Sequence, residues 1–265
     1  MRVRSFVLLS SLFSLLMVVL WSAAQQTVTT APPLNQRDPQ ALALLQGSIA
    51  AMGRSVPSDS TATGSVTVTA GSLTENGSFT VLTRGTNQTS EQIQTAHGFT
   101  LVYSNGGANR VVDATSTPLS FELALSSRSA VFPLILIAGV LNDPDSCFAY
   151  IGLDSFEGTE FHHLRYWNSF SSQPKFQFLS FLSQTNIWID ARSGLPKRLS
   201  QMQRAGSGSE PSIQVDVDFS DYKTVNGALY PFLVKKSLNG SPWMTFTVER
   251  VTFNSGLSDS NFPVQ

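Results

Sequence analysis

Residues 186–200, NIWIDARSGLPKRLS, constrain the fold more than any other part of this chain. Residues 187–189 are β-branched or aromatic, which favours extended backbone. Asp190 can hydrogen-bond back to the backbone of a turn, and Gly194 accepts a positive φ angle without strain. Pro196 donates no backbone hydrogen bond and therefore suits the start of a returning strand. The segment predicts a β-hairpin and hence a protein built from antiparallel strands.

The first 24 residues have the pattern of an export signal. Arg2 and Arg4 precede the mostly apolar stretch 6–21, and the small residues at 22–24 offer a cleavage site. The alternative is an uncleaved membrane anchor, but a spanning helix needs about 20 apolar residues and serines interrupt this stretch. We expect a periplasmic or otherwise exported protein. No cysteine lies at the cleavage site, so we expect no lipid anchor there.

Composition bounds what the mature chain can be. Residues 25–37 are polar and contain adjacent prolines, so we expect a flexible linker, followed by a single domain over 38–265. Charged residues make up only 13% of the chain and form no basic stripe, so nucleic acid is not an expected partner. Cys147 is the only cysteine, which excludes an internal disulfide and a zinc site built from cysteines. We expect Cys147 to be a small buried apolar residue, and we expect no cofactor and no metal.

Helical spacing is confined to two parts of the sequence. Asp38 can cap a helix that starts at Pro39, and apolar residues then recur every three or four positions up to Gly53. Residues 119–142 contain the apolar run VFPLILIAGVL, which predicts one or two buried helices with Pro133 in the first turn. A continuous apolar strand is the alternative for this short run.

Elsewhere apolar and polar residues alternate, and the pattern predicts roughly ten antiparallel strands. The alternation is clearest over 213–220, which has one apolar and one polar face. The Asn-Gly pairs at 76–77, 105–106 and 239–240 predict hairpin turns, because both residues accept positive φ. Residues 176–181 are predicted to be a strand in part.

No motif in the sequence names a reaction. A nucleophile elbow, a P-loop and a dinucleotide-binding glycine pattern are all missing. His162 and His163 occupy a predicted strand and point to opposite faces, so they cannot readily share a metal. Asp216 and Asp218 share a strand face, and a solvated face explains them more simply than acid–base catalysis. We expect no enzyme, and an exported hydrolase is a distant alternative.

The many aromatic residues of the chain favour a binding function. The chain has 18 Phe, 5 Tyr and 4 Trp, many of them on predicted strands. Most of these residues form a core between sheet and helices. A long, curved sheet can also leave an apolar hollow that holds an acyl chain, since each buried methylene contributes about 0.8 kcal/mol. The candidate inward-facing and ligand-binding residues are Val66, Phe79, Phe99, Trp188, Val215, Val217 and Phe232.

The order of export signal, helix, strand meander, apolar helical insert and further strands, together with IWIDARSGLPKRL, resembles the outer-membrane lipoprotein carrier superfamily (LolA/LolB-like). Residues 217–264 resemble the same proteins, with Y-K-x-V-N-G-x-x-x-P over 222–231 and D-x-x-F over 259–262. Arg84 is the candidate counterpart of an arginine on an early strand of the carriers. The resemblance implies an α+β, mainly antiparallel fold: a curved half-barrel sheet with helices packed on its concave face.

The same resemblance implies a non-catalytic periplasmic carrier for an acyl chain, a lipid or a lipoprotein, with a transient membrane-protein partner. The alternative is an exported, non-catalytic scaffold or interaction module with the same fold and a filled core. An open apolar cavity favours the carrier, and a packed interior favours the scaffold.

Overall fold

The computed structural model describes residues 36–126, 132–156, 158–204 and 212–264. The predicted export signal, most of the predicted linker and the Gly-Ser-rich segment after residue 204 lie outside these ranges. Gln36 and Arg37, the last two residues of the predicted linker, pair with a strand: the Gln36 carbonyl accepts from the Phe148 amide at 2.8 Å, and Arg37 forms a parallel bridge with Phe148. Among the described helices, none is long and apolar enough to cross a membrane.

Within these described ranges, thirteen strands form one open antiparallel sheet, which confirms the predicted fold class. The sheet consists of two meanders, β6 to β1 and β13 to β7, joined where β1 pairs with β13. We call β1–β6 the first arm and β7–β13 the second arm. The strands are β1 (Asp59–Ala70), β2 (Leu73–Arg84), β3 (Gln88–Gln94), β4 (Phe99–Ser104), β5 (Gly107–Val112), β6 (Thr115–Pro118), β7 (Ser146–Phe156), β8 (Thr159–Asn168), β9 (Thr185–Asp190), β10 (Pro196–Arg204), β11 (Ser212–Val225), β12 (Ala228–Leu238) and β13 (Ser241–Phe253).

The sheet must be strongly curved, since an ion pair joins two strands that are four positions apart in the strand order. Lys236 Nζ of β12 lies 2.7 Å from Glu91 Oε2 of β3, and both side chains are buried. Neighbouring strands are about 4.8 Å apart, so four steps along a flat sheet would separate these strands by about 19 Å. The two arms therefore face each other across a hollow.

Helices occupy the hollow and its edges, as predicted, except for a short one in the C-terminal tail. They are α1 (Pro39–Ala51), α2 (Phe121–Ser126), α3 (Pro133–Asn142), and the 3-10 helices η1 (Pro174–Ser183) and η2 (Asp259–Asn261). The Asp38 carboxylate caps α1 by accepting from the Gln40 amide at 2.8 Å. Apolar side chains of α1 and α3 join the inner face of the sheet in one core cluster. The apolar run after residue 131 is therefore a buried helix and not a strand.

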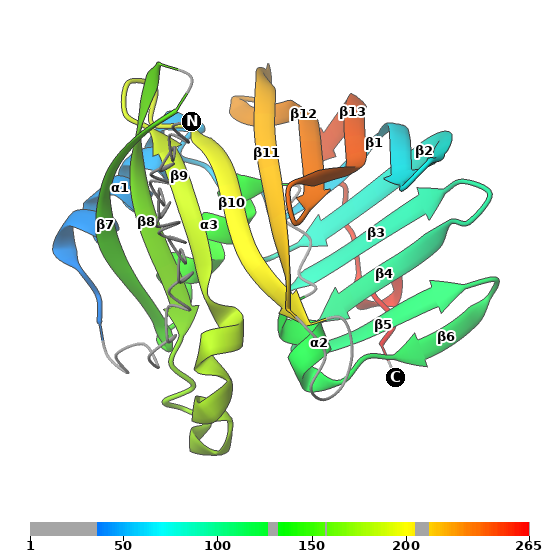
Figure 1. Ribbon diagram of the computed structural model, residues 1–265, viewed down its shortest axis with the longest axis horizontal. Coiled ribbons are helices and arrows are strands. Elements are labelled where there is room, and N and C mark those ends of the chain that lie inside the picture. The colour runs from blue at the N-terminus through cyan, green and yellow to red at the C-terminus, as the bar shows by residue number, and fades with distance from the viewer. Residues whose placement is uncertain (1–35, 127–131, 157, 205–211, 265) are drawn as a thin grey trace, which may run out of the picture. The chain divides into compact units, whose positions relative to one another are not determined.

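Helix α2 touches both arms of the sheet. It contacts β5 of the first arm and β10 of the second, and Figure 1 shows it beside the ends of β10 and β11. Ala124 packs with Tyr103 and Ala108, whereas Phe121 stacks on Phe176 of η1 with ring centroids 4.3 Å apart. The helix thus spans from one arm to the other.

Two of the three Asn-Gly turns are confirmed and one is wrong. Asn105-Gly106 and Asn239-Gly240 connect adjacent strands with positive φ at all four residues. Asn76-Gly77 instead lies inside β2, and the turn falls at Gly71, which has φ 62°. Gly77 is needed because β3 approaches closely: a Cβ there would lie 1.9 Å from the Gln94 carbonyl oxygen. An Asn-Gly pair therefore does not always mark a turn, because its glycine can instead be needed where another strand lies close to the backbone.

The strand predicted in part over residues 176–181 is also wrong. These residues belong to η1, a 3-10 helix with Pro174 at its start. Phe176 stacks on Phe121, and Leu179 and Leu182 are buried in a small cluster with Phe170. Packing in this cluster, rather than strand pairing, decides the conformation.

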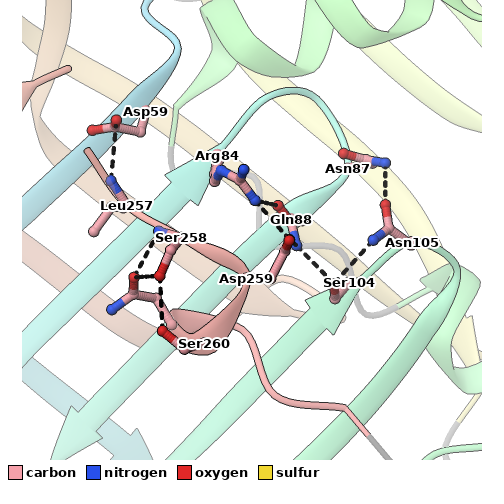
Figure 2. A network of polar contacts seen from close by, with 11 residues as sticks. Asp59, Arg84, Asn87, Gln88, Ser104, Asn105, Leu257, Ser258, Asp259 and Ser260 are labelled. Atoms are coloured by element: carbon pink, nitrogen blue, oxygen red, sulfur yellow. Dashed lines mark hydrogen bonds and ion pairs between the residues drawn. The ribbon is translucent and has the colours of Figure 1, made fainter. Parts of the chain in front are cut away.

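The end of the chain docks on the first arm, and Figure 2 shows the hydrogen bonds that hold it to Arg84 and Gln88. The buried Asp59 carboxylate accepts from the Ser255 amide at 2.6 Å and from the amides of Gly256 and Leu257. Farther along, Asp259 accepts from Gln88 at 3.0 Å and from Arg84 at 2.6 Å. The tail is thus fixed to the first arm by hydrogen bonds.

Candidate binding cavity

A cavity of about 270 Å³ lies between α3 and both arms of the sheet. Helix α3 forms one wall, β2 to β4 form a second, and β7 to β11 form a third. The lining residues are Thr83, Thr86, Asn87, Thr89, Tyr103, Phe132, Ile135, Leu136, Gly139, Val140, Asn142, Asp143, Ser146, Tyr166, Asn168, Ser183, Thr185, Leu199, Gln201, Val215 and Val217. Because residues from both arms and from the enclosed helix contribute, the cavity depends on the curvature of the sheet.

The buried part of the lining is mainly apolar, and we call it the floor. Floor residues come from α3 and from the adjacent strands of the second arm. They are Phe132, Ile135, Val140, Leu199, Val215 and Val217. Leu199 and Val217 are directly paired across β10 and β11, so their side chains form a continuous apolar surface. This surface can accept an apolar chain without any polar partner.

Five polar residues belong to the exposed and half-buried part of the lining, and we call them the rim: Asn87, Asn142, Asp143, Asn168 and Ser183. Asn168 donates to Asp143 Oδ2 at 2.8 Å, and its backbone amide donates to the Ser183 hydroxyl oxygen at 2.8 Å. Asp143 Oδ1 accepts from the Asp145 amide at 2.9 Å. Hydrogen bonds therefore fix the rim where α3 ends.

Helix α3 approaches the first arm closely at Gly139. A Cβ on Gly139 would lie 3.1 Å from the Cβ of Thr86, which follows β2. Glycine at this position lets the helix lie against the turn between β2 and β3, and both residues line the cavity. The contact between α3 and the turn that joins β2 to β3 therefore limits the width of the cavity beside Gly139.

Six of the seven predicted inward-facing residues do lie on the inner side of the sheet. Val215 and Val217 are 3% and 4% exposed and line the cavity. Val66 and Phe79 are buried in the packed core, where Phe79 meets Phe246 edge to face at 5.1 Å. Phe99 and Phe232 are partly buried against that core. Apart from the two valines, none of these predicted residues lines the cavity.

Trp188 does not face inward, so that prediction is wrong. Its neighbours Ile187 and Ile189 are buried in the core, and side chains alternate along a strand. On the convex face the Trp188 indole stacks on the His163 ring at 4.4 Å and donates to Asp154 at 2.7 Å. An aromatic residue between two isoleucines could have been placed outward from the alternation alone.

The sequence-based list missed the contribution of α3 to the cavity. Phe132, Ile135, Leu136, Gly139 and Val140 all line it and recur at three- and four-residue spacing. The apolar run predicts a buried helix, and this periodicity could have identified the stripe. Which side of the helix meets an unfilled space depends on packing against strands distant in sequence, so the sequence alone could not assign it.

Groups considered for catalysis make other contacts. His162 and His163 face opposite sides, as predicted: the Tyr150 hydroxyl lies 3.4 Å from His162, whereas His163 faces Asn186 on the convex side. Asp218 pairs with Arg198 at 2.7 Å. Its neighbour Asp216 is only 9% exposed and accepts from the Gln214 side chain, so the expected fully solvated face is wrong at this residue. Within the described ranges, no cluster of His, Cys, Asp and Glu could hold a metal ion.

Two smaller expectations have clear outcomes. Cys147 is buried, as predicted. Arg84, the candidate counterpart of the carrier arginine, donates to Gln88 and Asp259 at the docked tail. It does not line the cavity.

The fold is similar to several solved structures. A LolA superfamily protein from Nitrosomonas europaea matches with a TM-score of 0.57 and 13% identity over 84% of this chain and 97% of its own. A DUF1329 family protein from Desulfovibrio piger matches with a TM-score of 0.56 and 13% identity, over 86% and 98% of the two chains. A domain assigned to an outer membrane lipoprotein-sorting protein from Vibrio parahaemolyticus matches with a TM-score of 0.54 and 12% identity, over 84% of this chain and 96% of its own.

Sequence comparison adds nothing to these likenesses: no family model and no curated protein matches the chain. At 12–13% identity the structural matches establish the fold and not the function. The resemblance seen in the sequence is nevertheless confirmed at the level of architecture, and the protein has a LolA-like fold.

Proposed function

We propose that this protein is an exported, non-catalytic carrier that binds an acyl chain of a lipid or lipoprotein in the cavity beside α3. The observation that carries the proposal is the cavity itself, whose floor is apolar while its rim is polar. Most of the remaining concave face is packed with side chains, so the cavity is a local feature of an otherwise filled interior. An amphipathic ligand would place its chain on the floor and its polar end at the rim.

The size of the cavity favours one chain at a time. Pockets for small molecules typically occupy about 300–1,000 Å³, and this cavity of about 270 Å³ lies just below that range. Each methylene removed from water contributes about 0.8 kcal/mol, so a buried segment of ten methylenes would gain on the order of 8 kcal/mol before ordering costs. Binding would need no reactive group, and a ligand with several chains would need α3 to move.

Export and partners belong to the same proposal. The pattern of residues 1–24 supports secretion with cleavage, since it combines a basic start, an apolar stretch and small residues. Two structures with the same fold carry the names LolA superfamily and outer membrane lipoprotein-sorting, which supports a role in handling lipid outside the cytoplasm. A transient membrane-protein partner would then supply or accept the ligand.

The proposal is tested by native mass spectrometry of protein purified from the periplasm, before and after solvent extraction. We expect a lipid mass that disappears on extraction, and displacement of a fluorescent fatty acid by added lipid. Absence of both would favour the alternative function, a scaffold whose interior is filled.

A variant that fills the cavity gives the sharper test. Leu136 lies on α3 at the cavity wall and is only half-buried, so Leu136→Trp should occupy the space with an indole while the fold persists. We expect lipid affinity to fall at least tenfold. Leu153→Trp is the matched control, because Leu153 is 51% exposed and does not line the cavity. Equal loss in both variants, or in neither, would contradict the assignment of the site.

A further inference from the structure

We infer that the ligand's polar end is an uncharged, hydroxyl-bearing group of the acylglycerol type, and not a carboxylate or phosphate. The inference rests on the proposed function and specifies which lipids the same cavity selects. The rim carries it through two features: a carboxylate with acceptor sites left for a ligand, and the lack of a lysine, arginine or histidine among the described lining residues.

Asp143 places a carboxylate at the rim. The side chain is half-buried and lines the cavity. Its two oxygens each accept one hydrogen bond from the protein, from Asn168 and from the Asp145 amide. A carboxylate has about four acceptor sites, so two remain for a ligand. A hydroxyl group can donate to these sites, whereas an anion would be repelled.

Helix α3 ends at the rim, where the charge of its last carbonyls is offset by an arginine. Its last residue, Asn142, and the following Asp143 both line the cavity. The C-terminal end of a helix carries a partial negative charge, which disfavours anions nearby. Arg37 donates to the carbonyls of Leu141 at 3.2 Å and Asp143 at 3.4 Å and stacks over the Phe148 ring. This arginine is therefore held against the helix end and is not among the lining residues.

Three side chains at the rim each use one donor within the protein. The Ser183 hydroxyl donates to the Ser180 carbonyl at 2.7 Å, and the Asn87 amide donates to Asn105. The Asn168 amide donates to Asp143, as described above. A phosphate or carboxylate accepts hydrogen bonds only and needs such donors. Among the described lining residues there is also no lysine, arginine or histidine to balance a negative charge.

The test compares two lipids with the same chain and different polar ends. Native mass spectrometry titrations at pH 7.5 would measure binding of monopalmitoylglycerol and of palmitate, each below its aggregation concentration. We expect monopalmitoylglycerol to bind at least tenfold more tightly. Asp143→Asn should strengthen palmitate binding severalfold and so reduce the difference in affinity between the two lipids. Asparagine keeps the shape of the side chain and an acceptor oxygen but removes the charge.

The control for charge is Asp221→Asn, which removes one negative charge at an exposed ion pair with Lys223. We expect this variant to keep the preference of the unmodified protein. Palmitate binding as tightly as monopalmitoylglycerol would overturn the inference and leave the carrier function intact. Binding of neither lipid would overturn both. A preference that Asp143→Asn does not change would also overturn the role given to the rim.

Discussion

Asp59 shows how one residue holds a long tail in place. Its carboxylate accepts from the amides of Ser255, Gly256 and Leu257 and from the Ser255 hydroxyl. Burial alone would raise the pKa of Asp59, but these hydrogen bonds outweigh it and hold the pKa below the ordinary value of 3.8. A group whose pKa is lowered on folding gives its full stabilisation above the pKa of the unfolded state and loses it as the pH falls towards the pKa of the folded state.

The stability of the protein should therefore fall in acid partly through Asp59. Its contribution is complete well above pH 3.8 and is lost as the pH falls below 3.8 through the lowered pKa of the folded state. Asp59→Asn should cost on the order of 1–3 kcal/mol at pH 7 and flatten the pH dependence between pH 5 and 2. Urea unfolding measures both effects. Asp221→Asn, at an exposed site, should leave the curve unchanged, and identical curves for all three proteins would contradict the assignment.

Side-chain direction is the residue-scale property that the sequence predicts best when the alternation is followed strictly. Val215, Val217 and Phe219 alternate with polar residues and all are buried on the inner face. Trp188 fails because aromatic character suggested burial, whereas Ile187 and Ile189 already occupy the inner positions. The position in the alternation decides, because successive side chains must point to opposite faces.

Among the elements, the long strand β2 contains a glycine whose role is steric. A Cβ on Gly77 would lie 1.9 Å from the Gln94 carbonyl oxygen, so any side chain there forces β2 and β3 apart. Gly47 of α1 is the opposite case, since a Cβ there would meet nothing within 4 Å. The two glycines therefore predict opposite effects of the same substitution.

We expect Gly77→Ala to destabilise the protein by more than about 2 kcal/mol, through backbone displacement. Gly47→Ala should stabilise it by about 0.5–1 kcal/mol, because alanine loses less conformational entropy in a helix. Chemical denaturation of both variants is the measurement. A neutral Gly77→Ala would mean that β3 does not approach β2 this closely.

The contrast between correct and wrong turns has a physical basis. Asn105-Gly106 and Asn239-Gly240 adopt positive φ between paired strands, as the dipeptide favours. At 76–77 the same dipeptide lies inside β2, where it is paired with β1, and pairing of β2 with β3 as well starts at the next residue, Ser78. Pairing with two neighbours outweighs a local preference of about 1 kcal/mol, and a single sequence does not reveal those neighbours.

At the scale of the molecule, the sequence predicted the kind of sheet but not its connections. Strand order within each arm follows the chain, so the meanders could be expected from successive turns. The pairing of β1 with β13 joins Ser60 to Phe253, nearly two hundred positions away, and no local signal encodes it. The cavity depends on this closure and on where α3 settles, so its lining could not be listed in advance beyond Val215 and Val217.

The ion pair between Lys236 and Glu91 links the two arms across the hollow. Lys236 is 8% exposed and Glu91 is 2% exposed, and the lysine also lies over the Phe246 ring at 5.0 Å. Both carboxylate oxygens of Glu91 accept from the ammonium group, at 2.9 and 2.7 Å. Removing one partner leaves a buried charge without its counter-ion, which typically costs about 3–5 kcal/mol.

Lys236→Met should therefore destabilise the protein by about 3–5 kcal/mol in urea unfolding, whereas the double variant with Glu91→Leu should recover most of that loss. Recovery follows because two apolar residues of similar size can fill the space between the arms without a charge to desolvate. A double variant no more stable than Lys236→Met would show that the arms need the charged contact and not only the packing. A single variant as stable as the unmodified protein would show that β3 and β12 do not meet, and the curvature that forms the cavity would have to be reconsidered.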